Sequence, residues 1–237
     1  MGVTSDASTS GEPRPYELPD DGARAAWTRL RTEYFVAPEP LEPALVRQLL
    51  VSRPRRFVEL GASHGPISSL LAPSGVQCAA IDLNPPPGCF QPTVRADLRA
   101  LPLPAGSQDA AAAINCLYFL AEPLLGLREA NRALRSGATF VAGAPSRYHD
   151  SELRHVLPEW GSPSPFDAEE AATIVAQVFD VEDVEWWELP AYHLPTRQAV
   201  VDYLVAFGVP DADERAAEVA TPTPVTKSGV NVWARRR

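Results

Sequence analysis

The sequence is poor in the residues that mark membrane-spanning, secreted and metal-binding proteins. No apolar run reaches the roughly 18–20 residues that a membrane-spanning helix needs, so we expect no membrane partner. Only three cysteines occur, and Cys78, Cys89 and Cys116 have neither paired nor metal-ligand spacing. We therefore expect reduced, mostly buried thiols, no metal site and a cytoplasmic location.

Basic residues are also scarce relative to acidic ones. The chain has 21 lysines and arginines against 30 aspartates and glutamates, which gives a formal net charge of −9. Lys227 is the only lysine, and no basic stripe precedes the terminal run 235–237. A nucleic-acid-binding protein needs cationic side chains to neutralise phosphates. The charge pattern therefore argues against a nucleic acid and favours a small-molecule substrate.

Residues 1–20 are predicted to form a disordered tail. They are rich in serine, threonine, proline and acidic residues, and they lack the apolar segment of a secretory signal. Residues 21–237 are long enough to form one α/β domain with a single large core.

The most informative segment is a short apolar run followed by a glycine-containing turn. The run covers residues 56–60 and contains Glu59, and the turn contains Gly61 and Gly65. Apolar residues at helical spacing follow, so the segment predicts a strand, a tight loop and a helix start. This geometry holds a nucleotide at the carboxyl edge of a parallel sheet, and glycines let the backbone approach the ligand closely. A second apolar run ends in Asp82, which is placed to bind ribose hydroxyls.

Two kinds of cofactor are compatible with a glycine loop and a downstream acid. A dinucleotide loop requires G-x-G-x-x-G, whereas this loop has only Gly61 and Gly65, with Ser63 between them. Glu59 is a poor neighbour for a pyrophosphate and a favourable one for a cationic sulfonium and its amino group. The loop therefore favours S-adenosylmethionine over NAD, and a nicotinamide-dependent dehydrogenase is the less favoured alternative.

The rest of the chain has the element order of a known family. Apolar segments at 94–98, 107–115 and 138–143 predict further strands, and 124–134 predicts a helix. This order resembles that of class I S-adenosylmethionine-dependent methyltransferases of the small-molecule type, most clearly over residues 56–144. The resemblance implies an α/β fold with a Rossmann-like seven-stranded sheet. That sheet is mostly parallel, has an antiparallel C-terminal pair and carries helices on both faces.

The resemblance also implies which residues bind S-adenosylmethionine. Asp82 should bind the ribose diol and Asp97 the adenine amino group, while Glu59 and the loop glycines shape the methionine end. The full set of cofactor-binding candidates is Glu59, Gly61, Ser63, Gly65, Asp82, Leu83, Asp97, Leu98 and Asn115.

The loop departs from the family pattern at one glycine. The usual pattern is E/D-x-G-x-G-x-G, and Ser63 replaces the middle glycine, with His64 beside it. The expected function is methyl transfer to an oxygen or nitrogen of a small molecule, in specialised natural-product metabolism. The departure motivates an alternative, a methyltransferase-like protein that no longer methylates. Such a protein would catalyse an elimination or cyclisation, or act as a partner subunit in a biosynthetic pathway.

Four residues are candidates for contact with the reacting groups: His149, His64, Asn115 and Tyr118. His149 follows the fifth strand, where acceptor-binding loops emerge, and His64 lies at the edge of the cofactor loop. A surface or structural role is the alternative for each histidine. Asn115 and Tyr118 follow the fourth strand, whose end faces donor and acceptor in related methyltransferases. Alternatively, Asn115 caps the next segment through its own side chain.

The flanking segments complete the expected fold. Residues 21–37 and 41–52 predict two helices that either cover the acceptor as a lid or pack on the sheet. Residues 146–165 predict an active-site loop, and 181–189 with 225–234 predict the final strand pair. We thus expect one methyltransferase-fold domain over 21–237, with lid helices at 21–52, as a homodimer or as part of a heteromeric pathway complex.

Overall fold

The computed structural model describes residues 21–37 and 41–237, and the predicted disordered tail lies outside these residues. Its centre is a seven-stranded sheet in the order β3-β2-β1-β4-β5-β7-β6. The strands are β1 (Arg56–Leu60), β2 (Gln77–Asp82), β3 (Thr93–Arg95), β4 (Gln108–Ile114), β5 (Leu134–Pro145), β6 (Asp180–Leu194) and β7 (Thr223–Arg235). β1 to β5 pair in parallel, and β7 is antiparallel to both β5 and β6. The predicted Rossmann-like sheet is confirmed.

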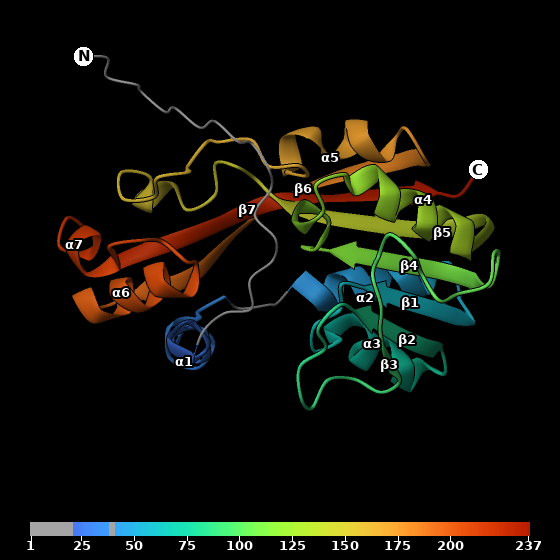
Figure 1. Cartoon of the computed structure of the whole chain (residues 1–237), viewed down its shortest axis with the longest axis horizontal. Helices are drawn as coiled ribbons and strands as arrows, with labels where there is room; N and C mark the ends of the chain where they lie inside the picture. The colour runs from blue at the N-terminus through green and yellow to red at the C-terminus, as the bar shows by residue number, and fades with distance from the viewer. Residues whose placement is uncertain (1–20, 38–40) are drawn as a thin grey trace, which may run out of the picture.

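Small apolar side chains allow helices to cover both faces of the parallel strands. In β4 the alanines at 110–113 are all buried, which lets helices approach the centre of the sheet closely. Two helices pack on one face and two on the other (Figure 1). They are α4 (Pro123–Ala133) and α5 (Ala168–Val175) on the first face, and α2 (Leu41–Val51) and α3 (Pro66–Leu71) on the second.

The C-terminal strand pair is longer than predicted and carries a helical lobe. β5 stops pairing with β7 at Pro145 and Gly229, whereas β6 and β7 stay paired as far as Leu194 and Thr223. This extension runs past the carboxyl ends of the parallel strands and supports three helices with a core of their own (Figure 1). The helices are α1 (Asp21–Arg29), α6 (Arg197–Ala206) and α7 (Ala212–Ala216), the last of which no sequence pattern predicted.

The two predicted N-terminal helices pack in different places. α1, with the π-helical turn Leu30–Tyr34, packs against α6, while α2 packs beside α3. Leu30 is buried among residues of α6 and the extension, away from the parallel part of the sheet. The two helices therefore do not act as one layer, and a lid function for α1 stays a proposal.

The bounds of β3 and β5 also differ from the sequence predictions. β3 ends at Arg95, because the carboxylate of Asp97 accepts the backbone N–H of Arg99 at 2.8 Å and turns the chain. Asp97 and Leu98 therefore follow the strand. The strand predicted at 138–143 is longer than expected, because β5 runs from Leu134 to Pro145. No helix within residues 21–37 and 41–237 is long and apolar enough to cross a membrane.

Candidate functional site

The loop between β1 and α3 has a left-handed backbone at three places. Gly61, Ser63 and Gly65 have φ angles of +63°, +48° and +72°. Glycine adopts this region freely, whereas a serine there costs roughly 1 kcal/mol. The N–H of Ser63 donates to Oδ2 of Asp82 at 2.8 Å, which ties the loop to the end of β2. The strained serine is thus held in place by the acid that was predicted to bind ribose.

Glu59 is buried and directed toward the start of α3. Its Oε1 accepts the N–H of Ile67 at 3.2 Å, and its Oε2 accepts the N–H of Ser68 at 2.7 Å. Burial raises the pKa of the Glu59 carboxyl, and the bonds from Ser68 and Ile67 oppose that rise. Glu59 therefore shapes the loop by fixing it to the helix, and both of its oxygens are already engaged.

The spaces above the two loop glycines are filled by the protein itself. A Cβ on Gly61 would overlap the side chain of Cys116, and one on Gly65 would overlap the Cβ of Phe90. The N–H of Phe90 also donates to the carbonyl of His64 at 3.0 Å, so the segment after β2 folds back over the loop. At the Cβ positions, these glycines therefore leave room for two packed side chains, and the close approach of a ligand to the loop backbone stays a prediction.

Asp82 ends β2 and joins two loops. Its Oδ2 accepts Ser63 N–H, and its Oδ1 accepts the N–H of Asn84 at 2.8 Å. The carboxylate is half-buried, and the next residue, Leu83, is 51% exposed. A carboxylate and an apolar surface thus lie side by side at the carboxyl edge of the sheet.

Asp97 is paired with an arginine that the sequence analysis did not single out. Nη2 of Arg99 lies 2.6 Å from Oδ2 of Asp97, and Nε lies 3.0 Å from Oδ1. These bonds lower the pKa of the Asp97 carboxyl. Leu98 is half-buried and packs against the core below α4.

The end of β4 places Asn115 and Tyr118 at the same sheet edge. Asn115 is exposed, has φ +53° and donates its N–H to the carbonyl of Gly143 on β5. The 3-10 turn Leu117–Phe119 has Cys116 at its N-cap position and no side-chain cap, so the capping alternative for Asn115 is wrong. The ring of Tyr118 lies 4.4 Å from that of Phe119. His64 is exposed on the cofactor loop.

His149 forms a close pair with the next residue. Its Nδ1 lies 2.7 Å from Oδ2 of Asp150, and the two side chains are 26% and 2% exposed. Because a carboxylate oxygen can only accept, Nδ1 carries the proton, which in a neutral ring leaves the lone pair on Nε2. Burial raises the pKa of Asp150, but the bond from His149 and the charge of Lys227 outweigh burial and lower it.

Two further residues complete this pair and were not predicted. Nζ of Lys227 lies 2.7 Å from Oδ2 of Asp150, and the hydroxyl of Tyr203 donates to the same oxygen at 2.6 Å. Lys227 comes from the extended part of β7, and Tyr203 comes from α6. The sequence singled out Lys227 only as the single lysine of the chain, and this does not indicate which residues it contacts.

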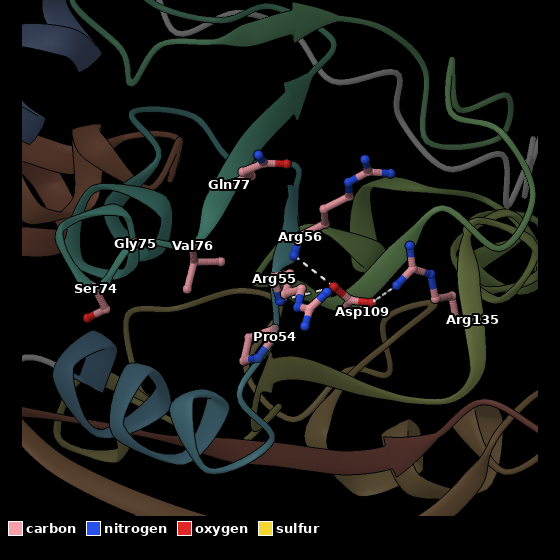
Figure 2. A pocket seen from close by; sticks show the side chains of 9 residues that line it. All are labelled: Pro54, Arg55, Arg56, Ser74, Gly75, Val76, Gln77, Asp109 and Arg135. Atoms are coloured by element: carbon pink, nitrogen blue, oxygen red, sulfur yellow. Dashed lines mark hydrogen bonds and ion pairs between the residues drawn. The ribbon is translucent and has the colours of Figure 1, made fainter.

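A cavity of about 440 Å³ lies at the opposite edge of the sheet, at the amino ends of β1, β2 and β4 (Figure 2). Asp109 at its centre accepts the N–H groups of Arg55 and Arg56 at 3.0 and 2.9 Å, and it pairs with Arg135 at 2.5 Å. These contacts join three chain segments, and we assign the cavity no part in the reaction.

Known proteins that resemble this chain have the same type of fold. The Methyltransferase domain family matches residues 58–142, and no curated protein matches the chain. One similar structure is the 1,6-didemethyltoxoflavin-N1-methyltransferase of Burkholderia thailandensis with S-adenosylhomocysteine, at 16% identity, 94% and 93% coverage of the two chains and TM-score 0.54. Another is the [4+2]-cyclase SpnF, at 15% identity, 93% and 99% coverage and TM-score 0.54.

A third similar structure concerns conversion of a disulfide bond into a thioacetal group during echinomycin biosynthesis. It is 17% identical, with 84% and 82% coverage of the two chains and TM-score 0.56. At these identities the structures show a common fold. Residues 58–142 thus match the Methyltransferase domain family, and the sheet has the Rossmann-like fold of these methyltransferase structures.

Proposed function

We propose that this protein transfers a methyl group from S-adenosylmethionine to an oxygen or nitrogen of a small molecule. The observation that carries the proposal is the placement of the His149–Asp150 pair. It lies on the loop after β5, at the same edge of the sheet as the glycine loop and Asp82. A proton acceptor and a cofactor bound at Asp82 would then face one acceptor over the carboxyl ends of the parallel strands.

The residues at this edge fit the proposed cofactor, which supplies an electrophilic methyl group when bound. Each oxygen of Asp82 accepts one N–H group and keeps a lone pair for a ribose hydroxyl. Leu83 offers an exposed apolar surface for adenine, and the ionised Asp97 offers an acceptor for its amino group. Glu59, Gly61, Ser63 and Gly65 act through the shape of the loop.

The proposed role of His149 is to take a proton from the acceptor. Methyl transfer needs a base only when the acceptor oxygen or nitrogen carries a proton at neutral pH. His149 is partly exposed, and its Nδ1–H is held by Asp150, so Nε2 is the nitrogen that can receive this proton. Asn115 and Tyr118 at the end of β4 are proposed to orient the acceptor.

The substrate class follows from charge and from the relatives. A net charge of −9 disfavours a nucleic acid, so the acceptor is a small molecule. The names of similar structures mention a didemethyltoxoflavin methyltransferase and echinomycin biosynthesis, which supports a place in natural-product metabolism. We place the reaction in the cytoplasm, in a homodimer or a heteromeric pathway complex.

A second candidate function is a cyclisation or elimination without methyl transfer, or a role as a partner subunit. Ser63 brings a side chain into the loop where the family has glycine, and Cys116 and Phe90 fill the space above Gly61 and Gly65. One protein of similar fold is named as a [4+2]-cyclase. In this reading the same His149–Asp150 pair would move a proton on a substrate that is not methylated.

Methyl-labelled S-adenosylmethionine and a panel of phenols, amines and hydroxylated aromatics test the proposal. We expect label in one acceptor class, and a loss of about 10²–10⁴-fold in turnover for His149→Ala. His155→Ala is the control, since the ring of His155 is exposed and its Nε2 lies 3.4 Å from the carbonyl oxygen of Glu218. Binding of S-adenosylhomocysteine without label transfer to any acceptor would favour the second function, and absence of binding would contradict methyl transfer.

A further inference from the structure

Three donors converge on one oxygen of Asp150, and the other oxygen has none. Oδ2 accepts from His149, Tyr203 and Lys227, whereas Oδ1 is buried and has no hydrogen-bond partner. The backbone of Asp150 also has φ +60°, which is unfavourable for a residue with a Cβ. A strained residue with an orphaned buried oxygen costs stability, and such costs persist where the arrangement serves a function.

A buried carboxylate requires a positive charge nearby, and two groups could supply it. One is His149, if its ring takes up a second proton, and the other is Lys227. The Lys227 ammonium lies 4.0 Å from the centroid of the Phe207 ring and 5.0 Å from that of Tyr203. Burial lowers the pKa of Lys227, but aromatic faces attract cations, so these rings and the carboxylate of Asp150 favour the charge on Lys227. With the charge there, the imidazole of His149 can stay neutral.

Other titratable groups also act on the cluster. Glu152, in the short turn after Asp150, accepts the N–H and hydroxyl of Thr226 at 3.2 and 2.6 Å, which ties it to β7. Its charge acts on both Lys227 and Tyr203. Burial raises the pKa of Tyr192 on β6, and the charge of Asp150 adds to the rise. These groups are common to all the variants below, so they do not account for differences between them.

We propose that Lys227, Asp150 and Tyr203 are positioning residues for His149. Lys227 carries the positive charge that Asp150 requires, and Asp150 fixes the imidazole with its proton on Nδ1 and its lone pair on Nε2. Tyr203 holds the shared oxygen in place from α6, so the helical lobe takes part in orienting a side chain beside the sheet. The catalytic use of this arrangement rests on the proposed function, whereas the protonation state of His149 can be measured without it.

The test is an NMR titration of the full chain labelled with ¹⁵N-histidine. The sequence has four histidines, and His149→Gln identifies the signals of residue 149 by their loss. We expect a neutral ring with the proton on Nδ1 in the wild type at neutral pH. In Lys227→Met the ring should take up its second proton about one pH unit or more higher, because it becomes the only cation beside Asp150. In Asp150→Asn the His149 ring should take up its second proton at lower pH than in the wild type, because the carboxylate is gone and the positive charge of Lys227 remains.

Lys227→Arg is the matched control. It keeps the positive charge, so the His149 ring should titrate at nearly the same pH as in the wild type. If Lys227→Met does not fold, the titrations of His149 in Asp150→Asn and Lys227→Arg still test the proposal. Equal titrations in Asp150→Asn and the wild type, or a wild-type ring protonated on Nε2, would overturn the proposal. The acidic limb of the pH–rate profile should shift by the same amount as the titration of the His149 ring. If the residues around His149 were purely structural, their substitution would lower activity equally at every pH. Shifted titrations without S-adenosylhomocysteine binding would contradict the proposed function and still support the positioning roles.

Discussion

Glycine serves two different purposes in this protein, and the loop after β1 shows the difference. Gly61 has φ +63°, and the space where its Cβ would lie contains the side chain of Cys116. Gly75, after α3, has φ +83° with no atom within 4 Å of that space. Both glycines avoid backbone strain, but only Gly61 also permits two chain segments to approach each other.

This comparison predicts unequal costs for the same substitution. Gly75→Ala should lower the free energy of unfolding by about 1 kcal/mol, which is the cost of the left-handed backbone alone. Gly61→Ala should cost at least about 1–3 kcal/mol more, because Cys116 must shift or the strand ends must separate. Urea denaturation of both variants measures the difference. Equal costs would show that the packing of Cys116 over Gly61 has no energetic weight.

At the scale of elements, an ion pair adds to the apolar packing between α1 and α6 within the helical lobe. Nε and Nη2 of Arg29 donate to the two oxygens of Asp202 at 2.7 and 2.6 Å, and Gln198 adds a bond at 3.1 Å. Burial raises the pKa of Asp202, but the bonds from Arg29 and Gln198 outweigh it and lower the pKa. An acid whose pKa is lowered in the folded state stabilises that state above its ordinary pKa, and this contribution is lost as pH falls further.

The attachment of α1 should therefore weaken in acid. We expect backbone amides of α1 to lose protection from hydrogen exchange, corrected for intrinsic rates, as pH falls below the ordinary range of an aspartate. In Asp202→Asn the protection should already be low at neutral pH and should depend little on pH. Asp183→Asn, an exposed site on β6, is the control. Protection of α1 that is unchanged in Asp202→Asn would exclude the ion pair as its main attachment.

The elements that could be predicted from sequence are those with local signals. β1 and β2 end at Leu60 and Asp82 after apolar runs, and Asp167 is the N-cap of α5, where its side chain accepts the N–H of Glu170. The contacts of Asp150 could not be predicted, because they join it to residues 53 and 77 positions away. The same limit applies to the packing above the loop glycines, since periodicity does not reveal which segment folds back.

At the scale of the whole molecule, several of the acidic residues lie on β6, at the exposed edge of the sheet. β6 is the last strand of the sheet, and its outer positions carry five exposed acids. These residues are Asp180, Glu182, Asp183, Glu185 and Glu188. Like charges along an edge strand oppose pairing with a second copy of that edge.

Neutralising the edge should promote self-association. We expect a Glu182→Thr, Asp183→Thr, Glu188→Thr variant to form larger species in sedimentation velocity than the wild type, because threonine also favours strand pairing. The control changes the same net charge in and after α7, with Asp213→Asn, Glu214→Gln and Glu218→Gln. If both variants associate equally, net charge rather than the edge strand controls association.

Calorimetric titration with S-adenosylhomocysteine tests the central claim, that the carboxyl edge of β1 and β2 binds an adenosyl cofactor. The wild type should bind, and Asp82→Ala should bind about 10- to 150-fold more weakly, because a charge-assisted hydrogen bond contributes roughly 1.5–3 kcal/mol. Asp180→Ala removes a surface pair with Arg237 at the far end of the sheet and should leave the affinity unchanged. Equal affinities for the wild type and Asp82→Ala, or no binding to the wild type, would contradict the claim.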